Sequence, residues 1–112
     1  MKTSFNGFNE NVATFEAASG VAAGKVVGIS TNGKVQAVTS GAFCGVCKNV
    51  RGDIAAVQLT GYVRVPYTGS LSLGYQKISA AAGSKIAADS TNGREHLVID
   101  IDSAASVAGI IL

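Results

Sequence analysis

The stretch from Gly28 to Val38, GISTNGKVQAV, indicates the fold class of this protein. It places an Asn-Gly pair, Asn32-Gly33, between two short runs in which apolar and polar residues alternate. Asparagine tolerates, and glycine readily adopts, the positive φ angles that a two-residue type I′ turn requires. The stretch therefore predicts a β-hairpin closed by Asn32-Gly33, with Ile29 opposite Gln36.

The same four letters, Ser-Thr-Asn-Gly, return at Ser90 to Gly93. If Asn92-Gly93 closes a second two-residue hairpin, Asp89 faces His96, which is the nearest approach to a catalytic dyad in the chain. A general base of this kind needs an orienting carboxylate and a nearby substrate proton or nucleophile. We favour the alternative, an exposed cross-strand charge pair beside a turn.

Strand-like runs separated by Gly or Asn-Gly occupy most of the sequence. They cover residues 11–17, 24–30, 34–38, 42–48, 53–67, 76–80, 84–88, 94–101 and 107–112. Many short strands with regular turn signals predict an all-β fold, a small barrel or sandwich with at most one short helical turn. Pro66 lacks an amide proton, so its strand should end there or lie at an edge.

A weak internal repeat accompanies this pattern. The segment AAGKVVGISTNGKVQAV from Ala22 aligns with AAGSKIAADSTNGREHLV from Ala81 when one residue is inserted. The alignment predicts a pseudo-symmetric β-domain or reflects chance similarity between two Gly- and Ala-rich hairpins.

Length and composition predict one compact domain, residues 12–112, preceded by a flexible arm, residues 1–11. The chain has 112 residues, of which 47% are hydrophobic and 14% charged, so some apolar surface is expected to be covered by a partner. The net charge is +2 and the basic residues are scattered, which argues against a nucleic-acid surface. No stretch approaches the length of a membrane span, and no secretory signal is recognisable, so synthesis in the cytoplasm is expected.

Structural roles are expected for the residues that could act in redox chemistry or bind a metal. Cys44 and Cys47 have CxxC spacing, but strand-like flanks would point them to opposite faces, so we predict two small buried residues and not a redox or zinc site. Asp100 and Asp102 could bind a hard cation, although a solvated strand is favoured. Phosphate-binding and nucleophile-elbow motifs are missing from the sequence. We therefore predict no enzymatic activity, no cofactor and no metal site.

Three stretches in order carry a resemblance to a known family: GVAAGKVVGISTNGKVQAV, then GAFCGVCKNVRGDIAAVQLTGYVRVPYTG, and finally VAGIIL. Together they resemble the head decoration, or capsid cement, proteins of tailed bacteriophages. The likeness covers roughly residues 12–112 and includes a glycine within an apolar strand at Gly45 and a charged turn at Arg51-Gly52-Asp53. It has no counterpart for the segment around His96, so nothing is transferred there.

The resemblance implies a β-rich homotrimer that binds the major capsid protein on the outside of the assembled coat and stabilises it. Such a protein of a phage or prophage would reside in the virion after assembly. The arm is then the expected capsid contact, with Phe5 and Phe8 as anchors and Asn9 and Val12 beside them; the alternative is a loose terminus with incidental aromatics. Two other classes stay open: a tail or fibre subunit, and a cytoplasmic β-barrel module that binds a small ligand or peptide.

Overall fold

Alternating apolar and polar residues produce strands throughout the chain. The computed structural model describes residues 11–112, and in that range it contains β-strands and no helix, which confirms the all-β prediction. The strands are β1 (Asn11–Ala17), β2 (Val26–Thr31), β3 (Lys34–Ala37), β4 (Gly45–Arg51), β5 (Ile54–Thr60), β6 (Tyr62–Pro66), β7 (Gly74–Ala81), β8 (Lys85–Ala88), β9 (Arg94–Asp102) and β10 (Val107–Ile111).

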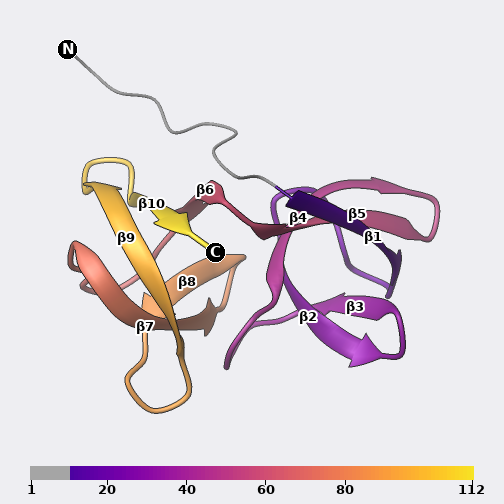
Figure 1. The fold of residues 1–112 in the computed structure, drawn as a ribbon, viewed down its shortest axis with the longest axis horizontal. Coiled ribbons are helices and arrows are strands. Elements are labelled where there is room, and N and C mark those ends of the chain that lie inside the picture. Colours follow the sequence, from indigo (N-terminus) through magenta and orange to yellow (C-terminus); the bar gives the residue numbers. More distant parts are fainter. Residues whose placement is uncertain (1–10) are drawn as a thin grey trace.

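The first five strands form a closed barrel, which we call the N-terminal barrel (Figure 1). Its strand order is β1-β3-β2-β4-β5, and antiparallel pairing of β1 with β5 completes the circle. On its other side β1 meets β3 in a short parallel contact, at Glu16 with Lys34 and Ala17 with Val35. β1 begins at Asn11, the last residue of the predicted arm.

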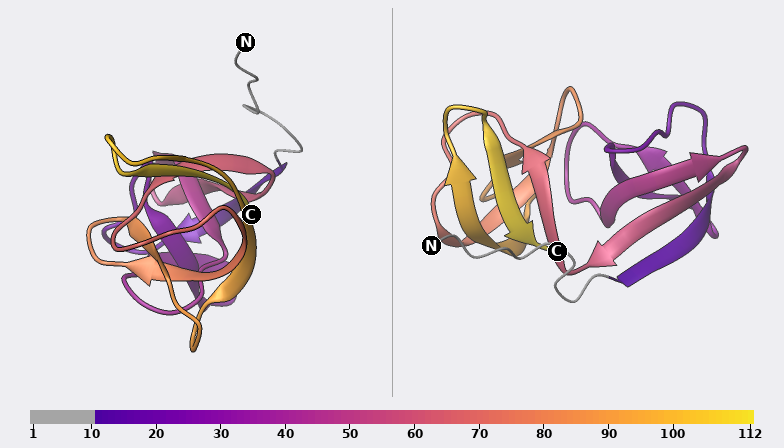
Figure 2. Two further views of the ribbon diagram at one scale, coloured as in Figure 1. Left: turned by 90° about the vertical axis from the view of Figure 1, so that its left-hand side faces the viewer. Right: turned by 90° about the horizontal axis from the view of Figure 1, so that it is seen from above.

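The last five strands form a second sheet, which we call the C-terminal sheet. Its order is β6-β10-β9-β7-β8, and it lies beside the N-terminal barrel in two of the views (Figures 1 and 2). The sheet curls until the end of β6 reaches β8 through one parallel bridge, Tyr67 with Ile86. Residues 11–112 therefore form two five-stranded units, and the assignment of residues 12–112 to one domain stays a prediction.

The two units have the same topology. Replacing β1 to β5 by β6 to β10 reproduces both hairpins, the antiparallel contact between first and fifth strands, and the parallel contact between first and third. Each unit also has a bulge at the same place, where Lys48 in β4 and Ile99 in β9 are the extra residues. The structure is therefore a tandem repeat of one β-unit.

The repeat inferred from the sequence was placed in the wrong register. It aligned residues 22–38, which contain the β2–β3 hairpin, with residues 81–98, which contain β8 and β9. In the structure the counterpart of β2–β3 is β7–β8. The alignment followed the tetrapeptide Ser-Thr-Asn-Gly, which lies at the end of the second strand in one unit but after the third strand in the other.

Buried side chains occupy matching positions in the two units. The correspondence follows from strand register: Val27 pairs with Ala37 as Ile78 pairs with Ala88, and Val57 pairs with Cys47 as Ile110 pairs with Val98. The matched core residues are Val27 and Ile78, Val35 and Ile86, Cys47 and Val98, Ala55 and Ala108, and Val57 and Ile110, all at most 2% exposed. The C-terminal unit has the larger side chains at most of these positions.

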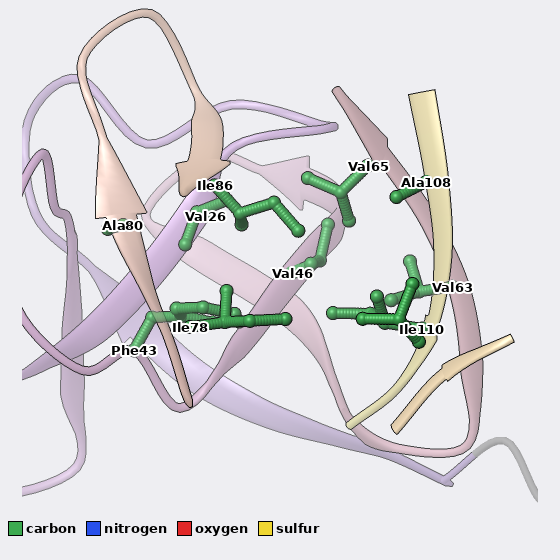
Figure 3. Close-up of a cluster of buried hydrophobic side chains, with 11 residues drawn as sticks. Val26, Phe43, Val46, Val63, Val65, Ile78, Ala80, Ile86, Ala108 and Ile110 are labelled. Carbon is green, nitrogen blue, oxygen red and sulfur yellow. The ribbon is translucent and has the colours of Figure 1, made fainter. Parts of the chain in front are cut away.

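The core of the C-terminal sheet extends into the N-terminal barrel. Val26, Phe43 and Val46 belong to the first unit, yet they pack in one cluster with residues of the second (Figure 3). A backbone hydrogen bond from Ala80 N to Gly41 O, 2.8 Å long, joins the units beside this cluster. Val27, Val35 and Cys47 belong to a separate, smaller cluster inside the N-terminal barrel.

The two units are joined at Gly61. The prediction of one strand over residues 53–67 is wrong, because Gly61 has φ +93° and separates β5 from β6. This left-handed conformation suits glycine and redirects the chain from one unit to the other. The prediction that the strand would end at Pro66 is confirmed.

Candidate functional site

The Asn32-Gly33 turn joins β2 to β3, as predicted, but its geometry differs from the expected one. Gly33 has φ +69°, whereas Asn32 is not among the described residues with positive φ, so the turn is not type I′. Thr31 pairs with Lys34 and Ile29 with Val35, which makes Ser30 an extra residue. A single left-handed glycine followed by a bulge is the other common short hairpin, and it shifts the predicted pairing of Ile29 by one residue.

Asn92-Gly93 lies in the loop between β8 and β9, and the hairpin predicted there is wrong. β9 pairs with β7, where His96 is opposite Gln76. Asp89 instead organises the exposed loop, because its Oδ1 accepts hydrogen bonds of 3.0 Å from Thr91 N and Asn92 N. These backbone donors lower the pKa of the Asp89 carboxyl.

The expected Asp89–His96 pair does not exist, because His96 lies in the core. Its side chain is 3% exposed, and its ring stacks on Phe43 with centroids 5.2 Å apart. His96 Nδ1 is 3.2 Å from Ile111 O, the hydrogen-bonding position for a proton on that nitrogen. Burial lowers the pKa of His96, so the neutral ring is favoured.

Gln58 lies at the junction between the two units. Its Nε2 donates to Thr60 O at 3.0 Å and to Tyr62 O at 2.9 Å, on either side of Gly61. Within residues 11–112, Gln58 Oε1 and His96 Nε2 are buried without a hydrogen-bond partner. Gln58 Nε2 therefore fixes the crossover at Gly61 through hydrogen bonds to the carbonyl groups on both sides of it.

The two cysteines are free thiols with structural surroundings. Cys47 is buried in the N-terminal barrel, where its Sγ lies 3.5 Å from Asn49 O, and Cys44 is half-buried. Burial raises the pKa of both thiols, which lowers the thiolate fraction available for exchange or metal binding. The prediction of a small buried residue is confirmed fully for Cys47 and partly for Cys44.

Asp100 and Asp102 serve separate contacts. Tyr62 Oη donates to the Asp100 carboxylate at 3.2 and 3.3 Å, and Ala105 N donates to Asp102 Oδ1 at 3.2 Å. Burial, followed by the neighbouring carboxylate, raises the pKa of Tyr62. A side chain at Gly109 would collide with Tyr62 and Asp100, so glycine permits this contact across the sheet. Across residues 11–112, no group of three or more His, Cys, Asp and Glu could hold a metal ion.

Exposed apolar side chains are better candidates for a binding site than the buried polar groups. Large exposed apolar side chains occur in both units: Val12, Ile29, Ile54, Leu73 and Tyr75. Val12 lies at the start of β1, is 48% exposed, and belongs to the predicted contact arm. Phe5, Phe8 and Asn9, the rest of that arm, lie outside the described residues.

The start of β1 is also a free strand edge among the described residues. Residues 11–16 pair with β5 on one side, but β3 pairs only with Glu16 and Ala17 on the other. An unpaired edge can accept another strand through main-chain hydrogen bonds. Neither the exposed tyrosine at position 75 nor this edge was singled out from the sequence; the edge depends on strand order, which sequence periodicity does not specify.

Comparison of the sequence with protein-family models gives no matching family, and comparison with curated proteins gives no matching relative. Within the described part of the chain, no helix is long and apolar enough to span a membrane.

Proposed function

We propose that this chain is a structural protein of a tailed-phage virion, a decoration protein that binds the outside of the assembled coat as a homotrimer and reinforces it. Binding alone would provide this activity, because several modest contacts made at once by an oligomer become effectively tight. The resemblance described for residues 12–112 supports the proposal, as does an all-β fold whose exposed apolar side chains are available for subunit contacts.

The observation that carries the proposal is the edge at the start of β1, which among residues 11–112 has no strand partner on its β3 side. It bears the exposed side chain of Val12, and it continues directly into residues 1–10, where Phe5 and Phe8 lie. A coat strand added beside β1 would satisfy main-chain groups along this edge, while apolar side chains would supply binding energy.

Deletion of residues 2–10 tests the proposal. The deletion should stop at Glu10, because Asn11 belongs to β1 and its Nδ2 donates to Thr60 Oγ1 at 3.0 Å. We expect the shortened chain to keep its fold and oligomeric state but to lose binding to capsids that lack the protein, measured by co-sedimentation. The capsids would come from the phage or prophage whose major capsid gene lies beside the gene for this chain.

A substitution of an exposed apolar residue far from the arm serves as a control. It distinguishes the effect of deleting the arm from a general effect of losing apolar surface. Ile54 is 44% exposed at the β4–β5 turn, far along the barrel from the start of β1, so Ile54→Glu should leave capsid binding unchanged. Equal binding by the full chain and the shortened chain would refute the arm as the contact. If no capsid binds the full chain, the decoration function itself is wrong.

A further inference from the structure

The tetrapeptide Ser-Thr-Asn-Gly occurs in two structural settings, so the reactivity of its asparagine can be compared within one chain. The first copy, residues 30–33, is followed by lysine, and the second, residues 90–93, is followed by arginine. Both copies therefore have the same residues before the asparagine, and a glycine and then a cation after it. A difference in reactivity between Asn32 and Asn92 must then come from the folded structure.

An asparagine that precedes a glycine can react with its own backbone, and asparagine is among the thermolabile residues. The amide nitrogen of the glycine attacks the side-chain carbon Cγ, so that a new nitrogen–carbon bond forms and the Cγ–Nδ2 bond breaks. The side-chain NH₂ group leaves with the amide proton as ammonia, and the product is a cyclic succinimide. Water then opens this ring at either carbonyl group and gives aspartate or isoaspartate. Glycine favours the attack because it has no Cβ to obstruct it.

Asn32 is open to this reaction. Asn32 and Gly33 are both exposed, and they are the two residues that link β2 to β3. Apart from the neighbouring residues of the chain, a methyl group on Gly33 would meet no atom within 4 Å. Within residues 11–112, the Gly33 amide donates no backbone hydrogen bond, so its nitrogen is available for the attack.

Asn92 has the opposite surroundings. It is exposed as well, but Gly93 is half-buried, and the Gly93 amide donates to Asp89 O at 3.0 Å. A methyl group on Gly93 would collide with the backbone of Asp89 and of β7. The Asp89 carboxylate also accepts a hydrogen bond from the Asn92 amide. The loop must therefore open before the Gly93 nitrogen can attack, because the proton that has to leave is held in a hydrogen bond.

We propose that Asn32 is a site of spontaneous deamidation in the folded chain and that the fold protects Asn92. The reaction is intramolecular imide formation followed by hydrolysis, and water is its co-reactant. A third Asn-Gly pair, residues 6 and 7, lies outside the described residues. The inference goes beyond the proposed function, since it concerns covalent chemistry of the chain itself and requires no coat protein.

Conversion of Asn32 would alter a contact that closes the N-terminal barrel. Gly33 O accepts a hydrogen bond of 2.9 Å from Glu16 N, next to the short parallel pairing of β1 with β3. Isoaspartate adds a carbon atom to the main chain at position 32, which displaces the Gly33 carbonyl group from the Glu16 amide. The isoaspartate form should therefore have a weaker closure between β1 and β3.

Peptide mapping of the aged full chain tests the proposal with an internal control. Cleavage after lysine and arginine releases residues 26–34 and residues 86–94, two peptides of equal length that each contain a single asparagine. After incubation of the folded chain in mildly alkaline buffer, the first peptide should be converted at least about fivefold faster than the second, measured by mass spectrometry. In chain unfolded by urea, the two should be converted at similar rates.

Three results of this experiment would overturn the proposal. The first is a lack of conversion at Asn32 in the folded chain, and the second is an equal rate at Asn32 and Asn92. The third is the same preference for Asn32 in the unfolded chain, because the flanking sequence and not the fold would then cause it.

Asp89→Ala tests the cause of the protection at Asn92. The change removes the carboxylate that holds the loop, so conversion of Asn92 should become about threefold faster or more, while conversion of Asn32 keeps its wild-type rate. An unchanged rate at Asn92 in this variant would contradict protection by the loop.

The isoaspartate form, separated from the unmodified chain by its additional negative charge, tests the consequence for the barrel. Hydrogen exchange of the Glu16 amide should be about fivefold faster or more in this form, whereas amides of β9 should exchange as in the unmodified chain. Equal exchange at Glu16 in the two forms would show that conversion of Asn32 leaves the closure between β1 and β3 intact and would overturn this part of the proposal.

Discussion

The N-terminal barrel and the C-terminal sheet share one topology but differ in how they are closed. The barrel is complete in itself, since β1 pairs with both β5 and β3. The sheet reaches β8 from β6 through only one bridge in the described residues, and Val26, Phe43 and Val46 of the barrel pack into its interior beside its own apolar side chains. A repeated unit can therefore be stabilised by its own strand pairing or by apolar side chains that its neighbour packs into its interior.

Most of the apolar core lies at the junction between the two units. The cluster that spans the junction contains more buried residues, and larger ones, than the cluster inside the N-terminal barrel. Because the larger cluster includes side chains from both units, the two should unfold together. Phe43 occupies the critical position, since it packs in this cluster and stacks on His96.

Phe43→Ala should have the largest effect. Truncation of a buried phenylalanine leaves a cavity and typically costs about 3 to 5 kcal/mol in free energy of unfolding. We expect a loss in this range by urea denaturation, with fluorescence and circular dichroism reporting one shared transition. A decrease in unfolding free energy below about 1 kcal/mol would show that packing of Phe43 into the C-terminal sheet does not stabilise the protein.

Matched core truncations compare the two units directly. Ile78 and Val27 occupy equivalent positions and are both fully buried. Ile78→Ala removes three side-chain carbon atoms and Val27→Ala removes two, by side-chain structure, so we expect losses of about 3 to 4 and about 2 kcal/mol respectively. A larger decrease in unfolding free energy for Val27→Ala would show that the cluster inside the N-terminal barrel, and not the junction cluster, contributes more to stability.

Acidification should weaken the junction through His96. Its pKa in the folded chain is lowered by burial, so at pH values below the ordinary pKa of about 6.5 the unfolded chain binds the proton more readily. The contribution of His96 to the unfolding free energy should thus be fully present above that pH. Below it, this contribution should decrease by at most about 1.4 kcal/mol per pH unit. Arg94 adds a small repulsion to the charged ring.

The control for this effect is His96→Phe, which keeps a ring against Phe43 but cannot be protonated. The difference in unfolding free energy between wild type and variant should change between pH 7 and pH 5, because only the wild type has the extra slope. Parallel pH profiles would show that His96 does not contribute.

The turns of the equivalent hairpins should give the smallest effects, with opposite signs. Gly33 in the β2–β3 turn and Ser84 in the β7–β8 turn both have positive φ, +69° and +60°. Gly33→Ala should cost about 1 kcal/mol, while Ser84→Gly should be neutral or stabilising by up to about 1 kcal/mol. Thermal unfolding of the two variants checks this, and a destabilising Ser84→Gly would show that its side chain matters more than its backbone conformation.

Sequence patterns predicted the strands well and the arrangement poorly. Alternation and turn residues located β1, β3 and the end of β6, because these depend on local preferences. The pairing of His96 with Gln76 rather than Asp89 depends on which strands become neighbours, and periodicity does not encode that choice. The tandem repeat was similarly obscured, because burial at positions such as Cys47 and Val98 is preserved while residue identity is not.

Hydrogen exchange in a Val46→Thr variant would test most directly whether the N-terminal barrel completes the core of the C-terminal sheet. Val46 lies in β4, and its replacement by threonine keeps the shape while burying a hydroxyl group beside Ile78 and Val65. We predict that amides of β7, β9 and β10 lose protection at least as much as those of β4 and β5. Loss of protection confined to β1–β5 would contradict the account.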